Sequence, residues 1–226
     1  MILLCAIAGI SPDSPNSEDS SYELMYEEDE NGNLKVVGVQ EKLTEGSPDN
    51  ESDVDDAIEY GTEIFTTVPY YCQWDSTWGT VPYGNGTIKS SGCGPTCCSM
   101  VISYFAKIKL TPSDLVKQIG NTYYVSGQGS SWSLFPGVAK MYGLQCSNLG
   151  KSIETVVAEL RKGHVVIASM GPGTFTKGGH FIVLTGVTAT GEITVNDPSH
   201  PDFCKSTFKQ SLISSESKNF WSFWKE

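Results

Sequence analysis

The sequence lacks both a basic run and an apolar run long enough to cross a bilayer. A transmembrane helix needs about 20 consecutive apolar residues, whereas the uncharged start, MILLCAIAGI, covers only residues 1–10. Proteins that bind nucleic acid carry a basic patch or stripe, and no Lys/Arg stripe occurs here. We therefore expect no stable membrane span and no nucleic-acid partner.

The sequence also lacks the cysteine and histidine spacings of a metal site or a disulfide framework. Its seven cysteines are an odd number, so they cannot all pair within one chain, and no CxxC or HxxxH motif occurs. Three of them, Cys93, Cys97 and Cys98, fall within SSGCGPTCCSM. Neighbouring positions on a helix point in different directions, which disfavours a shared zinc ion. We expect no metal and no cofactor.

Acidic charge is concentrated in the first part of the chain. Residues 1–66 hold 17 Asp/Glu and 2 Lys, a net charge of −15. Residues 67–226 hold 9 Asp/Glu and 13 Lys/Arg, a net charge of +4. All five Trp lie in the second part. Residues 11–66 are rich in Ser, Asp, Glu and Pro and cannot bury enough apolar surface to offset chain entropy. We predict a flexible acidic leader over 11–66 and one folded domain over 67–226.

Two features of the leader carry further expectations. Residues 1–10 resemble the end of a secretory h-region without its basic n-region, which predicts export to a secreted or cell-surface location. The alternative is an apolar terminus buried against the protein. Within 22–39, Asn31-Gly32 is a hairpin turn signal between two β-rich runs.

The pattern of residues 67–226 predicts an α+β fold, with helices first and antiparallel strands after them. Residues 65–71 suggest a short strand. A buried helix is expected from Pro95 to Ile108, followed by helices over 111–120, 131–143 and 152–163. Strands are expected over 164–170, in a hairpin over 178–198, and near 220–224.

Cys93 is the candidate nucleophile. It lies at the start of the predicted buried helix, where unpaired N–H groups and the helix dipole favour a thiolate. Gly92 and Gly94 allow a tight turn there and leave room for a substrate. Cys97 and Cys98 fall inside the helix, where we expect at least one to be a buried, inert core residue.

A reactive thiol needs a base, and the chain offers three histidines, His164, His180 and His200. His180 is favoured because it opens a predicted strand directly behind Gly178 and Gly179, with open access. The next strand, EITVNDP, alternates so that Asp197 shares the buried face of Ile193 and Val195. A carboxylate placed there needs a hydrogen-bond donor.

An imidazole N–H would supply that donor, and the bond would also set the imidazole tautomer. A Cys93–His180–Asp197 triad follows, with Asn196 as the alternative orienting residue. The backbone N–H of Cys93 and the side chain of Gln73 are candidate donors to an oxyanion.

Three segments in order resemble one known family. VPYYCQWDSTWGTVPYGNGTIKSSGCGPTCCSMVISYF, KGGHFIVLTGV and GEITVNDP resemble the cysteine-peptidase family 39-like domains, papain-like relatives of the bacterial double-glycine peptidases that trim bacteriocin leader peptides. The resemblance implies a papain-like cysteine proteinase fold, with the nucleophile at the start of the first helix and helices packed on an antiparallel sheet.

The resemblance also implies roles for particular residues. Cys93 looks like the nucleophile, His180 the base, Asp197 the orienting acid and Gln73 the oxyanion-hole residue. Trp132 looks like an aromatic that lines the substrate cleft, where Gly92 and Gly179 leave space.

The sequence thus predicts an exported thiol hydrolase that acts on a peptide or isopeptide bond of a peptide or protein. A cell-wall peptide is the alternative substrate. Acyl transfer to an amine and a catalytically idle binding module remain alternatives on the same fold.

Overall fold

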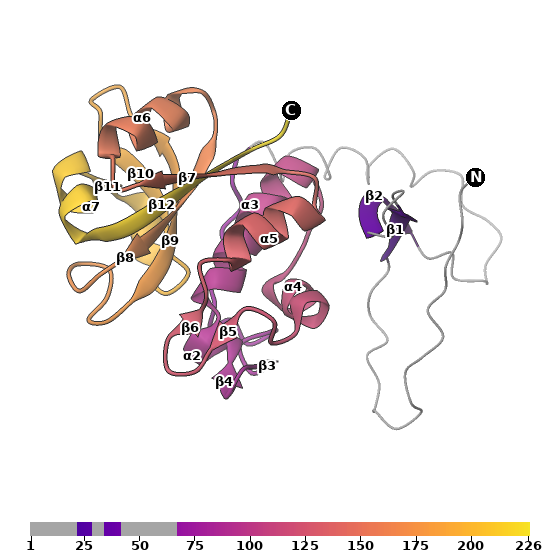
Figure 1. Ribbon diagram of the computed structural model, residues 1–226. Helices are drawn as coiled ribbons and strands as arrows, with labels where there is room; N and C mark the ends of the chain where they lie inside the picture. The colour runs from indigo at the N-terminus through magenta and orange to yellow at the C-terminus, as the bar shows by residue number, and fades with distance from the viewer. Residues whose placement is uncertain (1–21, 29–33, 42–66) are drawn as a thin grey trace, which may run out of the picture.

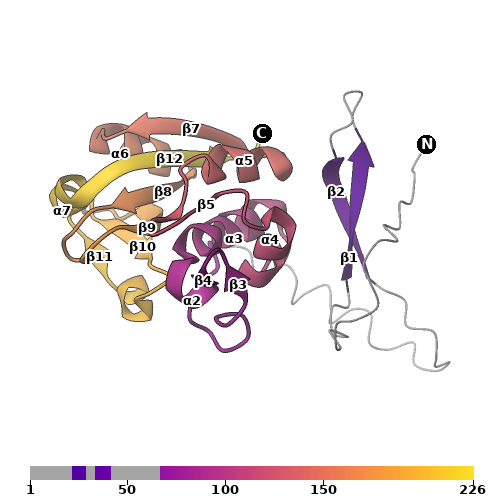
Figure 2. The same cartoon turned by 60° about the horizontal axis from the view of Figure 1, so that its bottom comes forward.

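The computed structural model describes residues 67–226, together with the backbone of residues 22–28 and 34–41. A six-stranded antiparallel sheet lies at the centre of residues 67–226, in the order β11-β10-β9-β8-β12-β7 (Figures 1 and 2). Its strands are β7 (Gln145–Gly150), β8 (Val165–Met170), β9 (His180–Val187), β10 (Ile193–Asn196), β11 (Thr207–Phe208) and β12 (Ser217–Trp224).

Helices cover both faces of this sheet. The helices on one side are α3 (Cys93–Ala106), α4 (Pro112–Ile119) and α5 (Leu134–Met141), and those on the other are α6 (Ile153–Arg161) and α7 (Gln210–Glu216) (Figure 1). The smaller elements are β3 (Pro82–Tyr83), β4 (Gly86–Thr87), α2 (Ile88–Ser91), β5 (Tyr124–Val125), β6 (Gly129–Ser130) and the 3₁₀ helix η1 (Pro201–Lys205).

Alternation along the central strands divides the apolar side chains between two cores. In β8, Val165 and Ile167 join the cluster beneath α3, α4 and α5, whereas Val166 and Ala168 join the cluster beneath α6 and α7. Successive side chains of a strand point to opposite faces. This explains the unbroken apolar run VVIA at residues 165–168, since a strand covered on both faces has no solvent side.

Gly92 joins α2 to α3 and lies close to Ile88, the first residue of α2. Gly92 ends α2 and precedes Cys93, and its φ and ψ are −96° and 17°. A Cβ atom at Gly92 would lie 2.7 Å from both the Cα and the carbonyl oxygen of Ile88. Only glycine permits this approach, and α3 therefore begins at Cys93, two residues before the predicted Pro95.

The predicted α+β class, with the candidate nucleophile at the start of a helix packed on an antiparallel sheet, is confirmed. The predicted hairpin is formed by β9 and β10, and the strand near 220–224 is β12, which lies inside the sheet between β8 and β7. The strand expected over 65–71 was wrong for its described part, since residues 67–71 form none. Strand β7 and helix α7 were not predicted, so helices and strands alternate more than expected.

Of the predictions for the leader, only the hairpin strands fall within described residues. β1 (Tyr22–Glu28) and β2 (Leu34–Glu41) pair antiparallel. The Asn31-Gly32 turn, the export remnant over 1–10 and the rest of 11–66 lie outside the described residues. Among the helices that are described, none has the length and apolar character needed to cross a membrane.

Candidate active site

The three residues of the predicted triad come from three elements that meet at one end of the sheet. Cys93 begins α3, His180 begins β9, and Asp197 directly follows β10, the antiparallel neighbour of β9. The buried Cys97 thiol donates a hydrogen bond to the carbonyl of Phe181 at 3.3 Å. This bond ties α3 to β9 one residue beyond His180, and so helps to hold the candidate nucleophile beside the candidate base.

A hydrogen bond joins the imidazole to the carboxylate, and the thiol lies beside the imidazole. Nε2 of His180 lies 2.7 Å from Oδ1 of Asp197. The Cys93 thiol lies near enough to the His180 side chain to act on the imidazole pKa. Because Nε2 faces Asp197, Nδ1 is the ring nitrogen that remains for the thiol. His180 is 8% exposed and Asp197 0%, so water competes little for this bond.

The charges of the site favour an imidazolium. Burial acts to lower the pKa of His180, but hydrogen bonds to Asp197 and Cys93 and the charges of both outweigh it and raise that pKa to about 10. Burial acts to raise the pKa of Asp197, but hydrogen bonds from His180, His200 and the Ser199 N–H, with the His180 charge, bring it below its ordinary value. The carboxylate and imidazolium therefore support each other.

Asp197 is shared between two histidines. Its Oδ1 also accepts the backbone N–H of Ser199 at 2.8 Å, and its Oδ2 lies 2.8 Å from Nδ1 of His200. The His200 ring is 44% exposed and stacks on Phe203 with centroids 4.9 Å apart. Sequence reasoning weighed His200 only as a base. Its three-residue spacing from Asp197, in a turn after a strand, was the available signal for this contact.

The two other candidates for these roles are engaged elsewhere. The Asn196 amide donates to the carbonyls of Val68 and Pro69, both at 3.2 Å, so it anchors the incoming chain and does not contact His180. His164 lies 2.6 Å from the Glu159 carboxylate and stacks on Trp224, away from the thiol. The geometry therefore favours Asp197 as orienting residue and His180 as base.

Gln73 is buried between the segments that carry Cys93 and Asp197. Its backbone N–H donates to Pro198 at 2.9 Å, and its Nε2 donates to the carbonyl of Lys89, in α2, at 2.8 Å. A primary amide has two N–H donors, so one N–H remains for another acceptor. The buried Oε1 has no hydrogen-bond partner among the described residues.

The three residues expected to border the substrate have different surroundings in the structure. Trp132 is 46% exposed and packs edge-on against Trp221, with ring centroids 5.1 Å apart. It lies two residues beyond Ser130, whose Oγ would be 2.8 Å from a Cβ at Gly94. Gly92 is required by its close approach to Ile88, whereas a Cβ at Gly179 would meet only Lys218 Nζ, at 4.0 Å. Their roles in substrate binding stay predictions.

The remaining cysteines of SSGCGPTCCSM belong to the core. Cys97 and Cys98 are buried, and burial raises the pKa of each thiol well above its usual value. The six cysteines in the described part of the chain are all free thiols. Ligand atoms of His180, Asp197 and His200 lie within 4.8 Å of one another, but each His already bonds the carboxylate. We assign no ion to them, and the expected absence of metal and cofactor stays a prediction.

A comparison with family models now places the sequence. Residues 65–223 match the model of the peptidase C39-like family, which spans more than half of the chain. The protein therefore belongs to the peptidase C39-like family, as the three motifs had indicated. No curated protein sequence matches the chain.

Three solved structures resemble this one. The peptidase domain of Streptococcus ComA, a bifunctional ABC transporter of a quorum-sensing pathway, has a TM-score of 0.48 and 16% identity over 61% of this chain and 93% of that one. A double-glycine-motif protease from an AMS/PCAT transporter, solved with its leader peptide, has a TM-score of 0.43 and 22% identity over 58% and 82%. A fragment of Prevotella intermedia prointerpain A has a TM-score of 0.49 and 14% identity over 83% and 87%.

Proposed function

We propose that this protein is a papain-like cysteine peptidase that hydrolyses a peptide or isopeptide bond through Cys93, His180 and Asp197. The observation that carries the proposal is the buried 2.7 Å hydrogen bond between His180 and Asp197, with the Cys93 thiol beside the same imidazole. A nucleophile, a base and a group that orients the base are the components that covalent catalysis requires.

The acylation step uses each of these groups once. The Cys93 thiolate attacks the carbonyl carbon, a C–S bond forms, and the carbonyl oxygen becomes an oxyanion. When the C–N bond breaks, the imidazolium of His180 gives its proton to the leaving amine. A thioester on Cys93 and a neutral imidazole remain, and Asp197 keeps the ring in place through Nε2.

Deacylation returns the site to its starting state. The neutral imidazole takes a proton from water, and the resulting hydroxide adds to the thioester carbonyl. The C–S bond then breaks, which releases a carboxylic acid and regenerates the thiolate and imidazolium. During both steps the oxyanion accepts hydrogen bonds from the Cys93 N–H, at the start of α3, and from the uncommitted N–H of Gln73.

Substitution of the nucleophile tests the proposal. Cys93→Ala should abolish both labelling by a thiol-directed probe at residue 93 and all hydrolysis of a peptide library, with the far-UV circular dichroism unchanged. Cys98→Ala is the matched control, because it removes a buried thiol from the same helix and should leave hydrolysis in place. Hydrolysis that survives Cys93→Ala would rule out the proposed mechanism.

The same assay separates the alternatives. Release of fragments from purified peptidoglycan, without cleavage of the peptide library, would favour a cell-wall peptide hydrolase. Amide products formed with an added amine, in place of acid, would favour an acyl transferase. Complete inertness of a folded protein whose Cys93 is not labelled would favour an idle binding module.

We propose in addition that the protein acts outside the cytoplasm of a bacterial cell, on the basis of the uncharged apolar residues 1–10 alone. Fractionation of cells that produce the full chain tests this. Recovery in the medium or at the cell surface would support export, and recovery in the cytoplasm alone would contradict it.

A further inference from the structure

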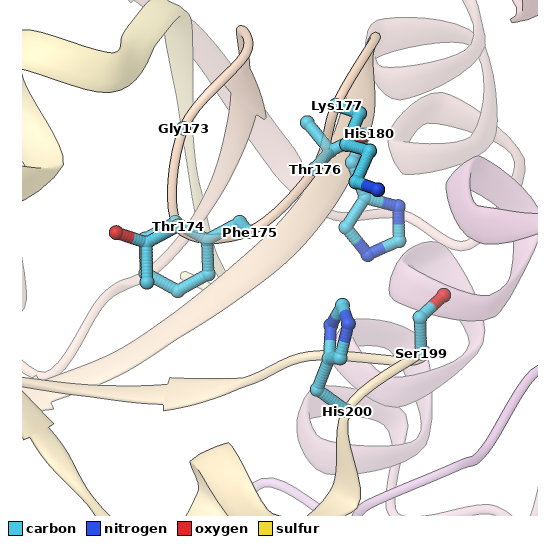
Figure 3. A pocket seen from close by; sticks show the side chains of 8 residues that line it. All are labelled: Gly173, Thr174, Phe175, Thr176, Lys177, His180, Ser199 and His200. Atoms are coloured by element: carbon cyan, nitrogen blue, oxygen red, sulfur yellow. The ribbon is translucent and has the colours of Figure 1, made fainter.

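A cavity of about 380 Å³ adjoins His180 and plays no part in the steps above (Figure 3). One wall is the segment that leads into β9, which includes Thr174, Thr176 and Lys177, and the opposite wall is Ser199 and His200, after β10. His180 lies between the two walls. A group bound in this cavity would therefore contact the proposed acid–base residue directly.

The side chains that line the cavity suit an anion. Lys177 is exposed, is cationic, and makes no ion pair with any residue in 67–226. His200 also lines the cavity, and its Nδ1 is held by Asp197. None of the eight lining residues, all within the described part of the chain, is acidic.

The two carboxylates nearest the cavity are already bound by protein donors. Glu216, which lies against Gly173, accepts the Thr174 N–H at 2.7 Å and the Thr174 hydroxyl at 2.9 Å. The Asp197 charge is shared between the two imidazoles. Neither carboxylate is placed to compete with an incoming anion for Lys177.

The position of the cavity indicates which part of a substrate would reach it. In acylation His180 protonates the leaving amine, so that amine must lie against the imidazole. The residues that follow the cleaved bond begin at this amine, and they therefore leave on the His180 side of the site. The cavity opens on that side.

We propose that this cavity is a subsite for a carboxylate on the leaving-group side of the substrate, with Lys177 as its specificity-determining residue. The assignment rests on the proposed function. An Asp or Glu side chain and the free carboxyl terminus of a short leaving peptide share this chemistry. The body of the protein, with its net charge of +4, is compatible with such a ligand.

Capture of the acyl-enzyme by amines measures this preference. The full-length protein is acylated with the p-nitrophenyl ester of N-acetylglycine, and paired amines then compete with water for the thioester. The amine nitrogen attacks the carbonyl, the C–N bond forms, the C–S bond breaks, and the amine proton passes to His180. An attacking amine occupies the place that a leaving amine vacates, so the ratio of amide to acid reports the leaving-group subsite.

Two pairs of amines distinguish the two sources of the carboxylate. Aspartic acid α-amide against asparagine α-amide reports a side-chain carboxylate, and alanylalanine against alanylalaninamide reports a carboxyl terminus. In at least one pair the acidic member should be captured about three- to fivefold better, as expected for one partly exposed ion pair. Lys177→Gln should remove this difference. Lys151→Gln, an exposed lysine after β7 at the far edge of the sheet, should retain it.

The outcomes separate the two claims. Normal acylation with equal capture of acidic and neutral amines in both pairs would overturn the subsite, and so would a preference that persists in Lys177→Gln. Failure of the ester to acylate Cys93, seen as no Cys93-dependent release of p-nitrophenol, would overturn the proposed function, and the subsite with it.

Discussion

Nε2 of His180 and Oδ1 of Asp197 lie 2.7 Å apart, in a place where the carboxylate has no exposure to solvent. A buried carboxylate is costly unless donors surround it, and here His180, His200 and the Ser199 N–H surround it. The pair therefore fixes the orientation of the His180 ring and leaves Nδ1 as the ring nitrogen available to Cys93.

Replacement of Asp197 should weaken catalysis, and the loss should be smaller where the new side chain can still accept a hydrogen bond from His180. Asp197→Ala should lower kcat/KM on the order of 100-fold, the scale of a general acid–base contribution, because nothing then orients His180. Asp197→Asn should lose less kcat/KM, since the amide oxygen can still accept a hydrogen bond from the Nε2–H group. Steady-state kinetics on a cleaved peptide checks the order, and equal losses for the two variants would contradict an orienting role.

The raised pKa of His180 predicts different pH limits for two reactions of the same thiol. Hydrolysis needs the imidazolium, so it should persist above the ordinary histidine range and fall as the pH rises through about 10. Alkylation by iodoacetamide needs only the thiolate, so it should not fall there. Asp197→Ala should move the alkaline limb of hydrolysis to lower pH, because the carboxylate helps to keep His180 protonated. Parallel pH–rate profiles test this, and coincident alkaline limits would contradict it.

Gln73→Ala should impair turnover without impairing the nucleophile. Loss of one oxyanion donor typically costs about 10²- to 10³-fold in kcat. The rate of Cys93 alkylation should stay within about twofold of the wild-type rate, since no oxyanion forms in that reaction. If hydrolysis and alkylation fall together, Gln73 acts through the structure of the α2 turn, to which its Nε2 is bonded.

Substitution of two glycines near the site by alanine should affect the melting temperature differently. Gly92→Ala introduces a Cβ atom 2.7 Å from backbone atoms of Ile88, so it should lower the melting temperature and reduce Cys93 labelling. Gly179→Ala brings its Cβ only to 4.0 Å from Lys218 Nζ, an ordinary contact, and should keep the wild-type melting temperature. If Gly179 borders the bound substrate, Gly179→Ala should raise KM alone. Thermal denaturation and kinetics on both variants give the comparison.

The parts of the site that lie on regular elements could be predicted from the sequence. Cys93 was found because two glycines and an apolar helical pattern mark one helix start, and Asp197 because strand alternation places it on the buried face with Ile193 and Val195. Strand β7 was missed because QCSNLG carries no clear alternation of apolar and polar residues. Strand β7 is an edge strand that forms only through its pairing with β12, which lies about 70 residues away in the sequence.

The sequence by itself determined the family, the fold class and the candidate nucleophile, since these follow from local patterns and from the order of three motifs. Only the tertiary structure decided which histidines contact the Asp197 carboxylate. His180 and His200 flank Asp197 from different segments, and separation along the chain gives no distance between side chains. The cavity beside His180 has the same origin, because its two walls are joined only by the pairing of β9 with β10.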